Sequence, residues 1–373
     1  MRFSVTNKVL RVIVLGATGV FGSRLVERLA REQGITLVLA ARNRDRLVAL
    51  ADGLRIMAEI RLIDRTKIGP ADLSGVDVVV DAAGPFQQSH PHVIEAALAA
   101  RVHYIDLADG RAFVAAIGDY DARAGAAGIA VVSGASSIPA LSHAVIDTLT
   151  EGWRSIDTIR VGIFPGNRAP RGLAVVQAIL SSAGRPVRVF RDGRWGEVPG
   201  WGLTQRWRID GVGKRWASVC DTPDQDLLVA RYSPTRSAEF FAGVELTIMH
   251  IGLLLLSLPV RWGLLCSLRP LAPLLHRVAT WLRPFGSDRG AMLVEVAGSG
   301  GTARWTLDAS GNRGPYVPVL ACVGLLRRWR DTPPLPGAGP CVGMLTLDDF
   351  DADFTGLGIV QRRAGHALHV PTA

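Results

Sequence analysis

The sequence is poor in the features that mark small disulfide-bonded, metal-binding or membrane-spanning proteins. Its four cysteines (Cys220, Cys266, Cys322 and Cys341) are widely spaced and include no CxxC pair, which excludes a disulfide scaffold and argues against a zinc site. No stretch offers the ~20 consecutive apolar residues of an ordinary membrane-spanning helix. No Ser-His-Asp arrangement and no other metal-ligand cluster stands out. We therefore expect a protein of a reducing, cytoplasmic environment.

Lysine is almost absent. Only three of the 42 basic side chains are lysines (Lys8, Lys67 and Lys214), so arginine carries nearly all of the formal net charge of +9. The arginines are spread along the chain and are not gathered beside aromatic residues, so we expect no nucleic-acid binding. An anionic ligand or a membrane surface fits this charge better.

The first 150 residues alternate between strand and helix patterns. The chain has 373 residues, of which 48% are hydrophobic. A chain of this length is too long for one ordinary hydrophobic core, so two domains, or one domain with a large insertion, are expected. Mostly apolar segments with helical segments between them predict strands at 9–15, 36–40, 58–63, 76–80, 102–107 and 129–133. Apolar strands separated by helices are typical of a parallel sheet covered on both faces. Residues 1–150 are thus predicted to be an α/β domain with a doubly wound, Rossmann-type sheet.

This alternation is lost after residue 150. Predicted strands at 155–164, 187–190, 195–198, 292–297 and 303–307 are partly joined by short turns. They indicate a second, largely antiparallel α+β domain over 151–310, expected to hold the substrate, with an apolar helical insertion at 244–285. Residues 311–373 are predicted to be a C-terminal helix at 319–329 and a tail that packs back on the nucleotide domain. The Pro/Gly-rich stretch 332–340 is interpreted as a linker.

A glycine-rich segment with the spacing GxxGxxG lies between the first predicted strand and the first helix. In such a segment the glycines allow a tight turn, close approach to a pyrophosphate and close packing of helix on strand. The free N–H groups at the start of the helix favour phosphate. The cofactor-binding residues predicted here are Gly16, Ala17, Thr18, Gly19, Val20, Phe21 and Gly22. The alternative is a glycine-rich turn in a domain that binds no nucleotide.

Arg42 follows the second predicted strand, where NAD-binding domains usually place an acidic residue on the ribose 2′-hydroxyl. A carboxylate there would repel a 2′-phosphate, whereas a guanidinium binds it through charge-assisted hydrogen bonds. The sequence therefore favours NADP over NAD. The alternative is that Arg42 is a solvated residue at the start of a helix.

Two further segments end strands at the same predicted sheet edge. Asp64 follows the third strand and either reaches the adenine amino group or caps the next turn. Ala83, Gly84, Pro85 and Phe86 follow the fourth strand, where small residues let the nicotinamide half of a cofactor pass close to the backbone. An ordinary tight turn is the alternative for this loop.

Tyr104 and Asp106 end the fifth predicted strand and are the candidate catalytic pair. Tyr104 would donate a proton, and Asp106 would orient it or hold a ribose hydroxyl. The alternative is that both side chains only satisfy buried backbone groups. We interpret His143 as a packed histidine, and Cys220 as unreactive because no neighbour in sequence would lower its pKa. Trp195, Trp201, Trp207 and Trp216 either line an apolar pocket or belong to a core.

Several of these motifs together resemble the saccharopine dehydrogenase-like family of NADP-binding oxidoreductases. The motifs are GATGVFG (16–22), AARN (40–43), DAAGPF (81–86), HYIDLADG (103–110) and VVSGASSIPAL (131–141), and more weakly WTLDASGNRGPYVP (305–318) and GAGPCVGMLTLDDF (337–350), which look like a bacterial branch. The resemblance implies an α/β substrate domain inserted before a C-terminal helix that returns to the nucleotide side. It also implies that residues matching 16–22, Arg42, 83–86 and 104–106 line the cofactor.

The resemblance leaves the substrate open, because the region that would recognise an amino-acid-derived imine is not recognisable here. The leading hypothesis is an NADP(H)-dependent oxidoreductase of an apolar, lipid-like or acyl substrate, since some branches of the family look like trans-acting enoyl reductases. Reduction of an amino-acid-derived imine is the alternative within the enzymes. A nucleotide-binding, membrane-associated scaffold without turnover is the third hypothesis.

The segment 244–285 is the least ordinary part of the sequence. Residues 246–260 carry no formal charge and include four consecutive leucines, but they are too few to span a bilayer. Pro259, Pro270, Pro273 and Pro284 interrupt any single helix. Short, leucine-rich helices with arginine and tryptophan suit peripheral contact with the inner face of a membrane. A hairpin buried against its own domain or against the partner of a homodimer is the alternative.

Overall fold

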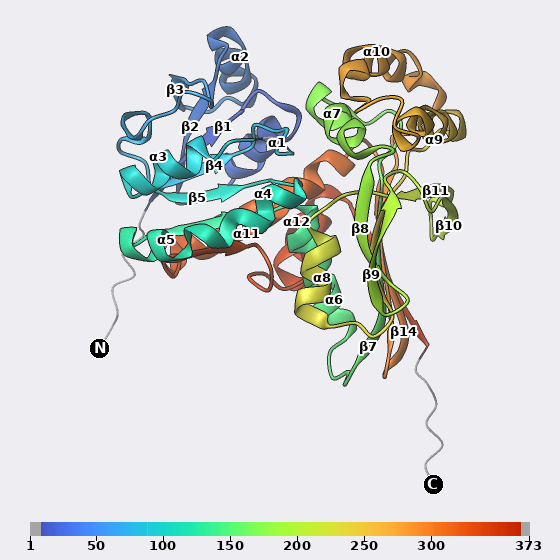
Figure 1. The fold of residues 1–373 in the computed structure, drawn as a ribbon. Helices are drawn as coiled ribbons and strands as arrows, with labels where there is room; N and C mark the ends of the chain where they lie inside the picture. The colour runs from blue at the N-terminus through green and yellow to red at the C-terminus, as the bar shows by residue number, and fades with distance from the viewer. Residues whose placement is uncertain (1–8, 88, 367–373) are drawn as a thin grey trace. The chain divides into compact units, whose positions relative to one another are not determined.

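The structure is a computed structural model that describes residues 9–87 and 89–366 (Figure 1). It divides into two compact units. The first unit comprises Met1–Ala140 and Tyr316–Leu345, and the second comprises Leu141–Pro315 and Thr346–Ala373. The division therefore falls about ten residues before the expected boundary at 150. The C-terminal part expected at 311–373 is shared between the two units.

The first unit is built on a parallel sheet of seven strands within the described residues. The strand order is β15-β6-β5-β4-β1-β2-β3, and every neighbouring pair is parallel. This confirms the predicted doubly wound sheet. The strands are β1 (Leu10–Leu15), β2 (Ile35–Ala41), β3 (Glu59–Leu62), β4 (Val78–Asp81), β5 (His103–Asp106), β6 (Ala130–Ser133) and β15 (Gly337–Pro340).

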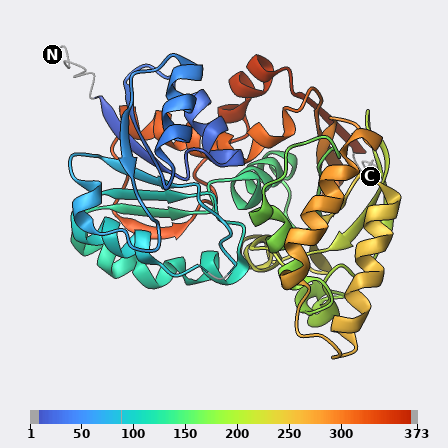
Figure 2. The same cartoon turned by 90° about the horizontal axis from the view of Figure 1, so that it is seen from above.

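Helices cover both faces of this sheet, as Figure 2 shows from above. They are α1 (Val20–Leu29), α2 (Arg44–Leu54), α3 (His92–Ala100), α4 (Arg111–Ala115), α5 (Asp121–Ala127) and α11 (Val317–Asp331), with the short 3-10 helices η1 (Pro70–Leu73) and η2 (Ala116–Tyr120). Helix α11 packs against α1, where the Tyr316 hydroxyl donates to Glu27 at 2.6 Å and Arg327 pairs with Glu32 at 2.6 Å. Pro318 lies in the first turn of α11, where its missing N–H has no partner to lose.

The interpretation of 332–340 as a linker was wrong, because Gly337–Pro340 forms strand β15. This strand pairs in parallel with β6, with Gly337 opposite Ala130 and Pro340 opposite Ser133. Without it β6 would be an edge strand with unpaired main-chain groups. Glycine and proline hide such a strand from propensity arguments, because neither is typical of strand interiors.

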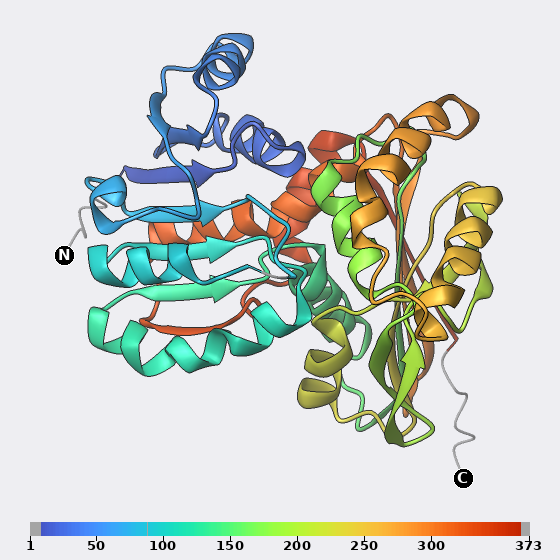
Figure 3. The ribbon, with the colours of Figure 1, turned by 45° about the horizontal axis from the view of Figure 1, so that its top comes forward.

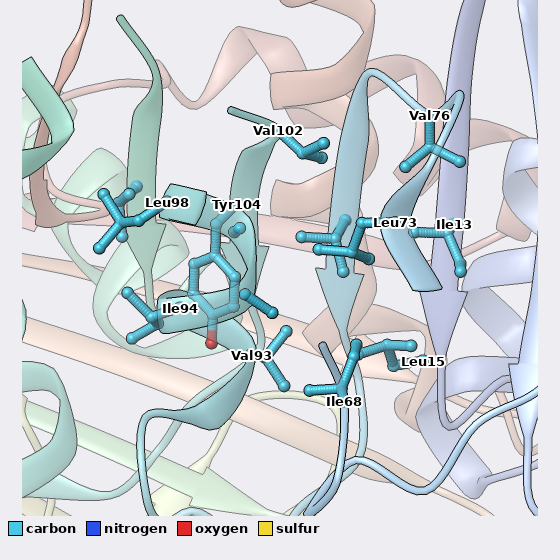
Figure 4. Close-up of a cluster of buried hydrophobic side chains, with 14 of the residues drawn as sticks. Ile13, Leu15, Ile68, Leu73, Val76, Val93, Ile94, Leu98, Val102 and Tyr104 are labelled. Atoms are coloured by element: carbon cyan, nitrogen blue, oxygen red, sulfur yellow. The ribbon is translucent and has the colours of Figure 1, made fainter. Parts of the chain in front are cut away.

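The core of the first unit lies between the sheet and the helices that follow β4 and β5 (Figures 3 and 4). It includes Ile13 and Leu15 of β1, Val79 of β4 and Val93 and Ile94 of α3, all at most 2% exposed. The ring of Tyr104 belongs to the same cluster and is fully buried beside Ile94 and Leu98 in Figure 4. This packing fixes the carboxyl ends of β1, β4 and β5, from which the candidate site is built.

The second unit contains a mixed, mostly antiparallel sheet in the order β10-β11-β12-β7-β13-β14-β16, with β8 and β9 attached through β12. Only the β12–β7 pair is parallel among the pairings described. The predicted second fold class, largely antiparallel α+β, is confirmed. The strands are β7 (Ile156–Phe164), β8 (Pro186–Arg191), β9 (Arg194–Pro199), β10 (Gln205–Ile209), β11 (Gly213–Val219), β12 (Ser237–Ala242), β13 (Gly290–Gly298), β14 (Gly301–Ala309) and β16 (Val360–His366).

Of the C-terminal part expected to pack back on the nucleotide domain, helix α11 and strand β15 lie in the first unit, whereas residues 348–366 belong to the second unit. Strand β16 pairs antiparallel with β14, and helix α12 (Asp348–Leu357) precedes it. The indole of Trp305 donates to Gln361 at 3.0 Å, and its ring lies 6.5 Å from that of Phe354. These contacts cover β14, which would otherwise be an exposed edge.

The other helices of the second unit are α6 (Ser142–Leu149), α7 (Leu173–Ser182), α8 (Asp224–Tyr232), α9 (Thr247–Arg261) and α10 (Ala272–Trp281), with 3-10 turns η4 (Arg269–Leu271) and η5 (Arg283–Phe285). The segment 244–285 is broken into short helices, and Pro270, Pro273 and Pro284 lie in first turns, as predicted. Pro259 was expected to interrupt a helix as well, but it lies inside α9, which continues to Arg261. Across 9–87 and 89–366, no helix combines the length and the apolar character that crossing a bilayer requires.

Three residues singled out from the sequence are interior residues of the second unit. Trp207 belongs to a core cluster with Phe164 and Phe241, which is the core alternative rather than a pocket lining. His143 is fully buried, and burial lowers its pKa to about 3. Burial likewise raises the pKa of Cys220 to about 12, so a thiolate does not form there near neutral pH.

Candidate cofactor-binding site

The carboxyl ends of five neighbouring strands of the first unit lie in one row. Leu15 of β1 pairs with Ala40 of β2 on one side and with Asp81 of β4 on the other. Asp81 in turn pairs with Asp106 of β5, and β5 pairs with β6. Open parallel sheets bind their ligands outside this edge, where the strand order reverses between β1 and β4. The row therefore brings the residues predicted from separate motifs to one edge.

The glycine turn between β1 and α1 is tight because each of its glycines has close neighbours. Gly16 has φ +72°, and a Cβ added there would lie 2.9 Å from the Cβ of Ala83. A Cβ on Gly22 would lie 2.1 Å from the carbonyl oxygen of Gly16, so α1 begins in contact with the turn. The Gly19 N–H donates to the same carbonyl at 2.8 Å. The turn thus places Gly16–Gly22 beside the Ala83–Phe86 loop, as the sequence predicted.

Gly19 differs from the other two glycines because it is exposed. It occupies the N-cap of α1 in an extended conformation that any residue can adopt (φ −77°), and no side chain caps this helix. A Cβ at Gly19 would meet only the Gly16 carbonyl, at 3.1 Å. The first N–H groups of α1 are thus open to a phosphate over a cradle that a larger side chain at Gly19 would fill. This geometry fits the pyrophosphate of a dinucleotide.

The loop after β2 presents a group of exposed arginines. Arg42 directly follows β2, and Asn43 caps α2 by accepting a hydrogen bond from the Arg46 N–H at 2.9 Å. The Arg46 guanidinium reaches back to the carbonyl of Thr18 in the glycine turn at 3.1 Å. Arg46 was missed from the sequence, although its position three residues after the N-cap places it on the first turn of α2, facing the turn. Arg42 and Arg46 together make this corner of the edge positive.

Asp64 serves the second of its two predicted roles. Its carboxylate accepts hydrogen bonds from the Thr66 N–H at 3.0 Å and the Thr66 hydroxyl at 2.8 Å, so it caps the turn after β3. These bonds lower the pKa of the carboxyl group. The carboxylate is exposed, and its acceptor capacity is already partly used. The geometry therefore favours the turn cap over contact with an adenine.

The Ala83–Phe86 loop is held by an arginine that the sequence did not single out. Arg65 donates to the buried carboxylate of Asp81 at 2.6 Å and to the Ser89 hydroxyl at 2.9 Å, and it lies over the Phe86 ring at 4.9 Å. Asp81 also accepts from the Ala83 N–H at 3.0 Å. The loop is thus fixed at both ends. Removing Arg65 would leave a buried carboxylate without its cation, which is costly.

Tyr104 and Asp106 lie in the interior and bond to each other. The Tyr104 hydroxyl donates to one oxygen of Asp106 at 3.0 Å. The other oxygen accepts from the Ser133 hydroxyl and from the N–H groups of Ala108 and Gly134, at 2.7–3.0 Å. Both residues are fully buried. These bonds agree with the alternative hypothesis, in which Tyr104 and Asp106 satisfy buried polar groups and fix the ends of β5 and β6. The role of Tyr104 as a proton donor stays a prediction that this geometry does not support.

The Asp106 network predicts a specific pH dependence of stability. Burial raises the pKa of Asp106 from 3.8 to about 6. A group whose pKa is higher in the folded state stabilises fully below its unfolded pKa, and this contribution is lost as pH rises through about 6. In Asp106→Asn the amide oxygen can still accept from Ser133, Ala108 and Gly134. The amide NH2 group then faces the Tyr104 hydroxyl. The difference in the free energy of unfolding between wild type and variant, from urea titrations at several pH values, should change between pH 4 and 6 and be flat above.

A constant difference across this pH range would contradict the assigned pKa. The NADPH affinity of the Asp106→Asn variant distinguishes a structural role of Asp106 from contact with the cofactor. If Asp106 only positions the strand ends, the folded Asp106→Asn protein binds NADPH as the wild type does.

No group of three or more His, Cys, Asp or Glu side chains in the described part of the chain is placed to hold a metal ion.

Comparison with known proteins agrees with this geometry. Residues 12–132 match the family model described as the saccharopine dehydrogenase NADP binding domain. Two solved structures are similar in fold: apo saccharopine dehydrogenase (L-Glu forming) from Saccharomyces cerevisiae and homospermidine synthase from Legionella pneumophila in complex with NAD. The first is 14% identical with a TM-score of 0.65, over 96% of this chain and 100% of the other. The second is 12% identical with a TM-score of 0.59, over 98% and 96%.

No curated protein sequence matches the chain. The matched domain contains the glycine turn, Arg42, the Ala83–Phe86 loop and the ends of β4 and β5. Residues 12–132 are therefore similar to the saccharopine dehydrogenase NADP binding domain, and the two solved structures share the fold of the chain. The match of this domain supports an oxidoreductase with a nicotinamide dinucleotide cofactor.

Proposed function

We propose that this chain is an NADP(H)-dependent oxidoreductase that reduces the C=N bond of an amine-derived imine, or runs the reverse reaction. The observation that carries the cofactor half of the proposal is the uncapped glycine turn beside exposed arginines. When bound, the reduced nicotinamide supplies the hydride. In this proposal Gly16–Gly22 hold the pyrophosphate, and the Ala83–Phe86 loop, which contacts the turn at Gly16, lies beside the rest of the cofactor.

The preference for NADP over NAD rests on charge at the end of β2. Arg42 and Arg46 are exposed, and Arg42 forms no ion pair within the described residues. The nearby carboxylate of Asp64 is engaged by Thr66, and the positive charge of Arg42 helps to lower its pKa. A 2′-phosphate would therefore meet two exposed guanidinium groups here, whereas the position directly after β2 offers an arginine and no carboxylate to the 2′-hydroxyl of NAD.

The substrate class is supported by the names of the two similar structures. Saccharopine and homospermidine are both amines, and one of the two enzymes is described as forming L-glutamate. Hydride addition to the carbon of C=N with protonation of the nitrogen gives such an amine and oxidised cofactor. A lipid-like or acyl substrate, the leading hypothesis from the sequence, is the second candidate. Exposed apolar side chains between residues 248 and 285 of the second unit favour it.

A substrate screen tests this proposal. Protein and NADPH are mixed with imines formed in place from 2-oxo acids and primary amines, and in parallel with enoyl and acyl thioesters; the loss of absorbance of the reduced nicotinamide is followed. We expect oxidation with at least one imine and none with thioesters alone. Turnover of thioesters only would replace the imine proposal by the second candidate. Tight NADPH binding without turnover of either would favour the non-catalytic scaffold.

A further inference from the structure

The second unit carries a concentrated apolar surface on the helical segment 246–286. More than half of the large apolar side chains exposed in the described part of the chain lie here, although the segment is about a tenth of its length. Trp262, Trp281 and Phe285 are 65–74% exposed, and Leu264 is 72% exposed. Soluble monomers rarely expose apolar surface in such concentration unless it contacts something.

The segment leaves the sheet and returns to it at one point, so its exposure is not a sign of loose packing. Its two ends meet at Glu245, whose carboxylate accepts from the Ser287 N–H at 2.8 Å and the Ser287 hydroxyl at 2.6 Å. Arg215 and the Asn167 N–H donate to the same carboxylate at 3.0 and 2.7 Å. Hydrogen bonds to the Glu245 carboxylate thus join the two ends of the segment and attach it to the second unit.

The inner face of the segment is packed against the unit as well. His250 of α9 is fully buried, with its ring 2.9 Å from the Ser218 hydroxyl and its carbonyl accepting from the Trp201 indole at 3.3 Å. His276 of α10 bonds to the carbonyl of Arg171 at 3.0 Å. Polar contacts therefore hold the inner side of these helices, where Val260, Leu268 and Ala272 are buried as well, while other apolar side chains of the segment stay exposed. The predicted burial against its own domain is thus limited to the inner face.

The charge of the segment is of one sign. Residues 246–287 contain no Asp or Glu, while Arg261, Arg269, Arg277 and Arg283 lie among the exposed apolar side chains. None of these four guanidinium groups forms an ion pair with a carboxylate in the described residues. A second copy of the same face would bring like charges together. An anionic lipid surface, in contrast, offers phosphates to the arginines and an apolar interior to the leucines.

We propose that residues 246–286 seat this protein on the surface of an anionic lipid bilayer. The exposed tryptophans lie at the depth of the head groups, where amphipathic rings are most favourable, and the leucine side chains enter the acyl boundary. The helices lie in the interface and do not cross it, in agreement with their lengths of 15 and 10 residues. The proposal is independent of the substrate and of the cofactor.

Flotation of the full-length protein with vesicles tests this proposal. One set of vesicles contains phosphatidylcholine with phosphatidylglycerol, and a second set contains phosphatidylcholine alone. We expect the wild type to float with the anionic vesicles, much less with the neutral ones, and less as salt is raised. The double variant Leu264→Glu/Trp281→Glu should lower the bound fraction at least about tenfold, because it places charge at the apolar boundary.

Exposed positions are used so that the variants keep their fold, which NADPH binding and circular dichroism check. Leu335→Glu, at a position 89% exposed in the first unit, is the matched control and should float like the wild type. A folded wild type that stays unbound with anionic vesicles overturns the proposal. So does a dimer in sedimentation experiments that the double variant dissociates, because the face then belongs to a second copy of the chain.

Discussion

Gly19→Val should abolish binding of NADPH and NADH while the protein stays folded. The glycine is exposed at the start of α1, its φ of −77° suits any residue, and its nearest neighbour would be the Gly16 carbonyl at 3.1 Å. A valine side chain would therefore occupy the place of the pyrophosphate, and the Gly16 carbonyl would have to shift by only a few tenths of an ångström. Loss of two charge-assisted hydrogen bonds, each worth about 1.5–3 kcal/mol, corresponds to more than about a hundredfold in affinity. Calorimetric titration measures this loss.

Two other glycines serve as controls for this variant. Gly53→Val, at an exposed position of α2 with no atom near its missing Cβ, should leave cofactor affinity unchanged. Gly22→Ala should lower the melting temperature, because its Cβ would lie 2.1 Å from a carbonyl oxygen. If folded Gly19→Val protein binds either cofactor with wild-type affinity, the dinucleotide does not lie over this turn.

Arg42→Asp should weaken the binding of NADPH about 10- to 150-fold, since one charge-assisted contact is worth about 1.5–3 kcal/mol. The affinity for NADH should change less than about threefold. The substitution removes a guanidinium from the end of β2 and places there the carboxylate that favours a free 2′-hydroxyl. The side chain is exposed, so the fold should tolerate the change. Dissociation constants of both cofactors, measured at one ionic strength, give the ratio directly.

Arg44→Asp is the matched control, because Arg44 is also exposed and begins α2 two residues later. It changes the net charge by the same amount and should reduce NADPH affinity far less. Arg46→Ala should lie between the two, since its guanidinium is held near the turn by the Thr18 carbonyl. Equal loss of NADPH and NADH affinity in Arg42→Asp would show that Arg42 does not select the cofactor.

The sheet of the first unit could be predicted from the sequence because most of its strands are apolar and are regularly separated by helices. Strand β15 was not, since Gly337–Pro340 has no side-chain pattern and is a strand only through its pairing with β6. The same limit applies to the tail, whose strand β16 depends on an open edge of β14. Both β15 and β16 are strands because they pair with segments distant in sequence, and the β-propensity of their own residues does not predict such pairing.

The candidate site divides in the same way. The glycine turn, Arg42 and the Ala83–Phe86 loop are local motifs, and the structure brings the turn and the loop into contact through Gly16 and Ala83. Arg65, which binds Asp81 sixteen residues away, left no local signal. The roles of Asp64 and Tyr104 depended on which partner each side chain meets. Spacing along the chain placed both at the right strand ends without identifying those partners.

The most direct test of the proposed cofactor function is calorimetric titration of the wild-type protein with NADPH and, separately, with NADH. The row of strand ends, the uncapped α1 and the arginines after β2 predict one cofactor site per chain, with NADPH bound at least about tenfold more tightly than NADH. Raised salt should weaken NADPH more than NADH, because the additional contact is between charges. Absence of heat and of thermal stabilisation with either dinucleotide, for a folded protein, would contradict the assignment of this edge as a cofactor site.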